Sequence, residues 1–304
     1  MATEGDNGRG KRVIGQTPLL IALAGFSMFS LGDGITKSTA GLWPGAAVAA
    51  LRFFIGACGL AVLLLIREGR CGFVMPRPLI QIGRGAAMTF STVCFFMAVQ
   101  LMPLATATAI GFMTPLLTAL LSALVLREHV PLRLWVAIVV AFAGVLLVLR
   151  PNVAALGPFA LLPLCSALGM AILMILNRAS AGGMSVLASQ FVVAALAAPM
   201  LAGVALVLDL TGHPAFHVGT PSWSLVARIA ILATMATIGH GLIYLATTRA
   251  TAATIAPANY VQILFAVTIG WIGFGDIPDA LTFTGIALIV GAGIWLLKAS
   301  ELRR

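Results

Sequence analysis

The sequence predicts an all-α membrane protein with ten transmembrane helices in two inverted five-helix repeats. Three observations predict this fold: the composition, the spacing of the apolar blocks and a weak internal repeat. Of the 304 residues, 61% are hydrophobic and 9% are charged, whereas a soluble domain has roughly 45–50% apolar and about 25% charged residues. This composition argues against a cytosolic enzyme, a disordered chain and a nucleic-acid-binding protein.

Ten apolar blocks follow one another along the chain, each close to the roughly 20 residues that one helix needs to cross a bilayer. Blocks of this length predict helices and not barrel strands, because a backbone in lipid must satisfy its own polar groups. A break at Arg150-Pro151-Asn152 divides them into two predicted repeats, residues 1–150 and 151–304. The ten predicted spans are Thr17–Lys37, Trp43–Ile66, Pro78–Gln100, Leu104–Leu126, Leu132–Leu149, Gly157–Asn177, Ser185–Leu208, Ser224–Thr247, Ala250–Phe274 and Ala280–Leu297.

The basic residues predict how these spans are oriented. If the amino terminus is cytoplasmic and the spans alternate, 14 Lys and Arg residues lie at inner ends, and three (Lys37, Arg150 and Arg228) lie outside. Such a bias towards the cytoplasmic side is typical of multi-pass proteins and accounts for the net charge of +9. We therefore expect an inner (plasma) membrane protein with both termini cytoplasmic and an external loop at Asp209–Pro221. The first block lacks a small-residue cleavage site, so we expect it to be a retained span.

The two halves of the sequence resemble each other at an offset of 148 residues. The matched pairs are Phe96 with Tyr244, Ala98 with Ala246, Ala105 with Ala253, Thr106 with Thr254, Phe112 with Tyr260 and Glu128 with Asp276. Because each half has five spans, an odd number, the second half must enter the membrane inverted. Inverted repeats are typical of secondary transporters, which place the substrate site near the midplane between the halves.

Several short motifs in the repeated spans carry a family resemblance. They are Ala105-Thr-Ala-Thr-Ala-Ile, Thr114-Pro115-Leu-Leu, Leu126-Arg-Glu128 and Phe142-Ala-Gly144 in the first half, and Gly275-Asp276 and Val290-Gly291-Ala in the second. Together with Leu51-Arg52-Phe53-Phe54, they make the chain resemble the EamA family of the drug/metabolite transporter superfamily. The resemblance implies alternating access around a central cavity, more peripheral fifth and tenth spans, and a small metabolite as substrate.

Three charged residues are candidates for coupling or gating: Asp33, Lys37 and Arg52. A charge near mid-bilayer costs at least about 2.5–3.5 kcal/mol, so we expect Arg52 to face the bundle interior or a wet cavity. In a structural role, it pairs with Asp33 or snorkels to a helix end. In a functional role, it is a gate or a contact for an anionic substrate. Asp33 and Lys37 are four residues apart, so they share a helix face and can pair. Asp33 is alternatively the best candidate to carry a coupling proton.

A second group of residues is expected to bind substrate in a cavity built mainly from spans three, four, eight and nine. His240 is the only histidine inside a predicted span. Spans four and nine carry Pro115 and Pro257, and helices interrupted at matching places point to a transporter's binding site. The alternative is that the polar residues only bond between helices, at about 0.6–2 kcal/mol each, and that the aromatic residues are core or lipid-facing. The expected binding residues are His240, Tyr244, Asn259, Tyr260, Gln262, Phe96, Thr106 and Thr114.

The sequence lacks a GxxxxGK[ST] phosphate loop, an HExxH motif and a filter-like motif, so we expect no ATP drive, membrane protease or channel. We predict a secondary transporter, not an enzyme, that imports or exports a small neutral, zwitterionic or amphipathic metabolite such as an amino acid derivative, nucleoside or vitamin. No cofactor, metal site or nucleic-acid partner is expected. The lipid bilayer is an expected partner. The sequence leaves open whether a proton is coupled to transport and whether the protein forms a homodimer. The alternative is a lipid-handling protein or an enzyme acting on a polyprenyl or phospholipid head group.

Overall fold

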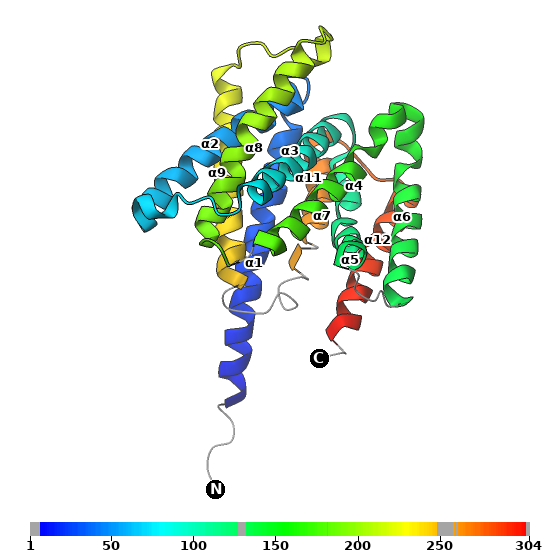
Figure 1. Cartoon of the computed structure of the whole chain (residues 1–304). Helices are drawn as coiled ribbons and strands as arrows, with labels where there is room; N and C mark the ends of the chain where they lie inside the picture. The colour runs from blue at the N-terminus through cyan, green and yellow to red at the C-terminus, as the bar shows by residue number, and fades with distance from the viewer. Residues whose placement is uncertain (1–6, 127–131, 181, 248–257, 260, 302–304) are drawn as a thin grey trace.

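The structure, a computed structural model, describes residues 7–126, 132–180, 182–247, 258–259 and 261–301. These residues form helices joined by short connections, with no β-strand among them (Figure 1). Seven helical segments are long and apolar enough to cross a membrane. Three shorter apolar helices, Trp135–Val148, Val261–Phe274 and Ala280–Trp295, complete the set of predicted spans. The all-α, ten-span fold expected from the sequence is confirmed.

The helices keep the order of the predicted spans. The first half contains α1 (Asn7–Lys37), α2 (Gly45–Glu68), the short 3₁₀ turn η1 (Gly69–Gly72), α3 (Pro78–Leu101), α4 (Leu104–Gly111), α5 (Thr114–Leu126) and α6 (Leu132–Leu156). The second half contains η2 (Gly157–Leu161), α7 (Leu162–Ser180), α8 (Val186–Asp209), η3 (Pro214–Phe216), α9 (Trp223–Thr247), α11 (Val261–Phe274) and α12 (Ala280–Glu301).

The break predicted at Arg150-Pro151-Asn152 is wrong, because α6 continues through these residues to Leu156. A proline removes one helical hydrogen bond. Here it lies beyond the apolar segment Trp135–Val148, where water can meet the carbonyl that is left free. The chain leaves the helix at Gly157 instead, whose φ of +57° is a left-handed conformation that glycine adopts readily.

The fourth predicted span consists of two helices. α4 ends at Gly111, and the next two amides bond to carbonyls only three residues back. α5 begins at Thr114, whose hydroxyl donates to the Gly111 carbonyl at 2.8 Å. Pro115 follows at a position in the first turn where no amide hydrogen is needed. The interruption expected from this proline is therefore present, whereas the matching Pro257 lies outside the described residues.

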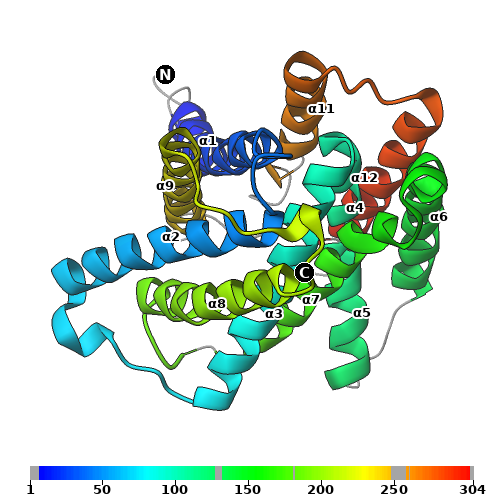
Figure 2. The ribbon, with the colours of Figure 1, turned by 90° about the horizontal axis from the view of Figure 1, so that it is seen from above.

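The packing of the helices shows the internal symmetry predicted by the repeat. If each helix is exchanged for the one five spans further along, α1 becomes α7, α2 becomes α8 and α3 becomes α9. The packed pair α1–α9 then becomes α7–α3, and α3–α8 becomes α9–α2, and both of these pairs exist. The pairs α2–α8 and α6–α12 map onto themselves. Figure 2 shows α6 and α12 together at one side, with α2, α8 and α9 at the other.

Glycines allow two of these helix pairs to approach closely. A Cβ on Gly144 of α6 would lie 2.7 Å from the carbonyl oxygen of Gly285 in α12, and one on Gly285 would lie 2.6 Å from that of Gly144. Between α1 and α9, a Cβ on Gly25 or on Gly239 would lie 3.0 Å from the other residue's carbonyl oxygen. Small residues at such contacts are typical of helix packing in membranes, where backbone proximity supplies the attraction.

A buried arginine joins α3 to α7 and α8. Arg84 is 4% exposed, and its guanidinium donates to Asn177 Oδ1 at 2.6 Å, to Gln81 Oε1 at 2.5 Å and to Ser189 Oγ at 2.7 Å. All three acceptors are uncharged. The cluster satisfies the general condition for burying a charge, which is that its donors find acceptors. The sequence placed Arg84 only among the basic residues of the inner side, so this packing role is a new finding.

Candidate substrate cavity

Two adjoining chambers form the candidate cavity between the halves of the chain. The central chamber, with Asp33, Arg52 and Asn259 in its wall, has a volume of about 430 Å³. The vestibule, with Arg52, Arg67 and Gln190 in its wall, has a volume of about 480 Å³. Arg52, Met88, Ala236 and His240 line both chambers, so the two spaces lie next to each other.

The central chamber brings together most of the residues that the sequence singled out. Thr106 is buried but lines neither chamber, whereas Thr108, two residues further on, lines the central one. The side chain of Tyr244 and the whole of Tyr260 lie outside the described part of the chain. The predicted residues in the chamber wall are Asp33, Arg52, Phe96, Thr114, His240, Asn259 and Gln262.

Arg52 lies on α2 at the junction of the two chambers. Its guanidinium carbon is 4.8 Å from the centroid of the Phe53 ring and 5.6 Å from that of Phe96. These cation–π contacts fix the guanidinium without using its N–H donors. The direct Asp33–Arg52 ion pair considered from the sequence is not among the ion pairs of the described residues.

His240 lies on α9 and faces both chambers. Its Nδ1 lies 2.8 Å from the carbonyl oxygen of Ala236. Because a carbonyl can only accept, Nδ1 carries the proton, and in the neutral ring Nε2 is left as an acceptor. The ring also makes an edge contact with Phe29 of α1, with centroids 4.7 Å apart. His240 therefore lines the cavity and touches α1 through its ring, whereas its hydrogen bond lies within α9 and is not the interhelical bond considered from the sequence.

Uncharged polar groups line the chamber on the side of α4 and α11. The Oγ1 atom of Thr108 is buried and has no hydrogen-bond partner in the described structure. Gln262 donates from Nε2 to Oδ1 of Asn259, which leaves the Gln262 carbonyl and the Asn259 amino group for other partners. These groups can hydrogen-bond a bound solute or water.

Two helices contribute more to the chamber than the sequence suggested. The expected cavity comes mainly from spans three, four, eight and nine, but α1 and α7 also form its wall. Methionine and phenylalanine in apolar spans look the same whether they face lipid, the core or a cavity, so their position could not be predicted. The chamber residues from these two helices include Phe26, Met28, Phe29, Ser166, Met170 and Met174.

An ion pair at the end of α1 joins the two halves. Lys37, at the end of α1, places its Nζ 2.5 Å from Oδ2 of Asp276 and 2.9 Å from the carbonyl oxygen of Met102. The same ammonium lies 5.3 Å from the centroid of the Phe274 ring. Lys37 therefore pairs with Asp276 and not with Asp33, the partner that their spacing made possible. The partner comes from the loop between α11 and α12, far away in the sequence.

The local backbone explains how Asp276 reaches this position. Gly275 has a φ of +70°, and the amides of Gly275 and Asp276 bond back to carbonyls in the last turn of α11 at 3.1 and 2.9 Å. This arrangement is a Schellman-type end, which turns the chain sharply. Asp279 caps α12 by accepting from the Thr282 amide at 2.7 Å. Hydrogen bonds from Thr282 lower the pKa of the Asp279 carboxyl below its ordinary value.

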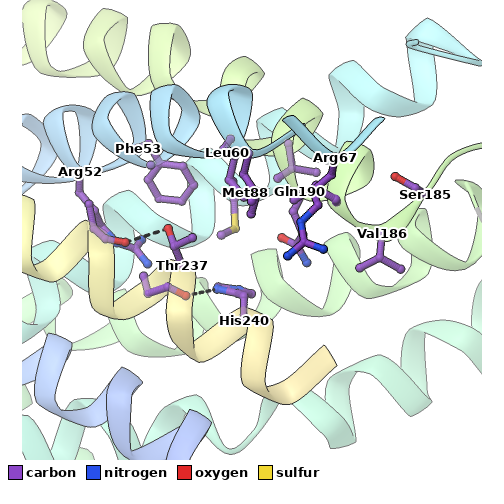
Figure 3. Close-up of a pocket in the computed structure, with 18 of the residues that line it drawn as sticks. Arg52, Phe53, Leu60, Arg67, Met88, Ser185, Val186, Gln190, Thr237 and His240 are labelled. Carbon is purple, nitrogen blue, oxygen red and sulfur yellow. Dashed lines mark hydrogen bonds between the residues drawn. The ribbon is translucent and has the colours of Figure 1, made fainter. Parts of the chain in front are cut away.

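The vestibule reaches the surface near the end of α2. Figure 3 shows Arg52 and, further along α2, Arg67, with Gln190 of α8 opposite and His240 of α9 below. The mouth of the vestibule includes Glu68, which accepts a hydrogen bond from the Ser185 hydroxyl at 2.7 Å. The vestibule is therefore open to the surface at the end of α2.

Comparisons with known proteins agree with this architecture. A protein of known crystal structure is 20% identical and superposes with a TM-score of 0.60 over 95% of this chain and 99% of its own, which shows a shared fold. The pseudopaline exporter CntI of Pseudomonas aeruginosa is 28% identical over 296 residues, covering 93% of this chain and 96% of that protein.

Other relatives are also transporters by name. The S-adenosylmethionine uptake transporter of Rickettsia bellii is 26% identical over 256 residues, which is 84% of each chain. The riboflavin transporter of Rhizobium johnstonii is 25% identical over 66% of this chain and 64% of its own. Residues 16–150 match the EamA-like transporter family. With the ten-span fold and the relatives that align over most of the chain, this match agrees with the resemblance to the EamA family of the drug/metabolite transporter superfamily.

Proposed function

We propose that this protein is an inner-membrane secondary transporter of a small neutral, zwitterionic or amphipathic metabolite. The observation that carries the proposal is the pair of adjoining chambers between the two halves, one of which reaches the surface near the end of α2, while the Lys37–Asp276 pair joins the halves at the end of α1. A site reached from one side at a time, at the interface of inverted repeats, is the requirement for alternating access. The relatives named for S-adenosylmethionine, pseudopaline and riboflavin support a metabolite-sized substrate.

The orientation follows from the distribution of basic residues. With both termini in the cytoplasm, α1 runs outward, so the Lys37–Asp276 pair lies at the external end and the vestibule opens to the cytoplasm. The structure then corresponds to an inward-open state. The cavity residues of the central chamber are the proposed substrate contacts, Lys37 is a gating residue, and Asp33 is the candidate to carry a coupling proton. Self-association remains a prediction.

Transport without chemical change distinguishes this proposal from its rival, an enzyme or lipid-handling protein. The purified protein, reconstituted in lipid vesicles, would be offered labelled S-adenosylmethionine, riboflavin and a labelled metabolite extract. We expect at least one solute to accumulate unmodified in protein-containing vesicles and not in empty ones. Chemical conversion of the solute or movement of lipid alone, without solute uptake, would contradict the proposal.

Metabolite profiling of cells with and without the protein complements the vesicle assay. A substrate that is exported accumulates inside cells lacking the protein, and one that is imported is depleted in them. The same comparison therefore gives both the substrate class and the direction of transport.

A further inference from the structure

Two opposite charges face the central chamber without a protein partner. Arg52 and Asp33 both line it, and neither makes a hydrogen bond or an ion pair with another described residue. Their nitrogen and oxygen atoms are more than 4.0 Å apart, so the two groups do not pair directly. Because both line the same chamber, a bound molecule there can meet both.

Unpaired charges inside a membrane protein are costly, so each calls for a partner in the chamber. Neither group is sealed off, since the buried polar atoms without a partner in the described residues are the hydroxyls of Thr89 and Thr108. The guanidinium presents a planar fork of donors that matches a carboxylate. The Asp33 carboxylate can accept from an ammonium group.

The rings beside Arg52 prepare it for such a partner. Phe53 and Phe96 hold the cation over their faces, at 4.8 and 5.6 Å from the ring centroids. Because a face contact leaves the in-plane N–H groups free, the guanidinium is positioned while its donors stay available. A group held in place before binding loses less conformational freedom when the ligand arrives.

The charges of the central chamber also balance. Among the described residues of its wall, the acidic and basic side chains are those of Asp33 and Arg52. Their formal charges cancel. A substrate with one carboxylate and one cationic nitrogen meets both. A substrate with only one of these groups leaves the other protein charge without a partner, and specificity follows from that penalty.

The rest of the wall accommodates an amphipathic side group. Uncharged donors and acceptors come from His240, Asn259 and Gln262. The surface between them is apolar. It is formed in large part by Phe26, Met28, Phe29, Phe95, Met170 and Met174.

We propose that the central chamber recognises an amino-acid-type zwitterionic head group, with the substrate carboxylate on Arg52 and its cationic nitrogen on Asp33. The substrate's side group lies against the phenylalanine and methionine wall. This inference rests on the proposed transport function and narrows its substrate class.

The test uses the purified full-length chain in detergent, with ligand binding measured as a concentration-dependent rise in melting temperature. Two series of probes are compared: L-phenylalanine with phenethylamine and phenylpropionate, and L-methionine with methylthiopropylamine and methylthiobutyrate. Each series shares a side group and removes either the carboxylate or the amine. In at least one series, the zwitterion should bind roughly tenfold or more tightly than both truncated analogues.

Two variants assign the charges to the two residues. Arg52→Gln should remove the difference in affinity between the zwitterion and the amine that lacks its carboxylate. Asp33→Asn should remove the difference in affinity between the zwitterion and the acid that lacks its amine. If Arg52→Gln does not fold, Arg52→Lys keeps the charge but loses the planar fork, and should reduce the first of these differences severalfold. Arg70→Gln removes an exposed arginine that lines neither chamber, and should leave the order of affinities unchanged.

The inference is overturned if neither zwitterion binds better than its truncated analogues, or if the advantage survives in both Arg52 variants. Its failure is separable from that of the proposed function. Vesicles that accumulate a metabolite while the zwitterion shows no advantage would retain transport and reject the head-group site. Selective zwitterion binding with no solute movement in vesicles would retain the head-group site and reject transport.

Discussion

The Lys37 ammonium lies 2.5 Å from the Asp276 carboxylate, and these two residues are separated by 239 positions in the sequence. The side chains are 12% and 24% exposed, so the pair is partly shielded from solvent. One partner comes from the end of the first helix of one repeat and the other from the last loop of the second. The pair therefore reports whether the halves are in contact at this end of the cavity.

Removing the Asp276 charge should open this end more often. A partly buried pair is worth about 1 kcal/mol, which corresponds to roughly a fivefold shift in the equilibrium between closed and open states. In a cysteine-free background with Met28→Cys in the central chamber, Asp276→Asn should increase labelling by an impermeant thiol reagent applied from outside. The exchanged pair Lys37→Asp with Asp276→Lys should restore part of the protection.

Asp279→Asn is the matched control, because Asp279 lies in the same loop and caps α12 without contacting Lys37. It should leave labelling from outside unchanged. Equal labelling of the Asp276→Asn protein and its parent would show that the pair does not control access to the chamber.

The topology can be tested at two serines. Cysteine in place of Ser222, in the connection between α8 and α9, should react with an impermeant reagent added to intact cells. Cysteine in place of Ser300, near the carboxyl end, should react only after the cells are opened. The expectation comes from the distribution of basic residues. Reaction of Ser300→Cys from outside would reverse the proposed orientation or change the number of spans.

His240→Ala should weaken transport with little loss of protein. The side chain bonds to a carbonyl within its own helix, so truncation leaves no interhelical hydrogen bond unmade, while the chamber loses an acceptor and an aromatic face. We expect transport at limiting substrate to fall about tenfold, the value of one lost hydrogen bond of about 1.4 kcal/mol. Thr234→Ala, on the exposed side of α9, is the control and should transport normally. A His240→Ala protein that transports normally, or that fails only because it unfolds, would exclude the site role.

Arg84→Met should destabilise the protein without changing which solute it binds. The substitution leaves Asn177, Gln81 and Ser189 without their shared donor, and each buried group left unpaired costs about 1–3 kcal/mol. Thermal unfolding in detergent would measure the loss. Arg77→Met removes an exposed arginine with one hydrogen bond to a carbonyl and should lower the melting temperature much less. Equal losses in the two variants would show that the buried cluster has no special contribution.

The fold could be predicted because length and apolar composition determine the spans, and the odd number of spans per half determines their inversion. The partner of Lys37 could not be predicted from the sequence. Asp33 is one helical turn away in the sequence, whereas Asp276 becomes a neighbour only when the two halves pack. The same limit applies to the choice between Thr106 and Thr108. Which side of α4 faces the cavity depends on how this short helix is rotated against its neighbours, and Leu104 to Ile110 are all buried, so burial does not distinguish the two threonines.

The contact between Gly144 and Gly285 restricts how the two repeats can move. Because each α-carbon faces the other residue's carbonyl oxygen at the closest approach that glycine allows, sliding α6 along α12 by one turn would drive a larger side chain into the opposite backbone. The two helices are therefore expected to travel as a single rigid body. The change in shape needed to expose the cavity to the other side must then be taken up by the remaining helices, among which α4 and α5 already have a discontinuous backbone at the chamber wall.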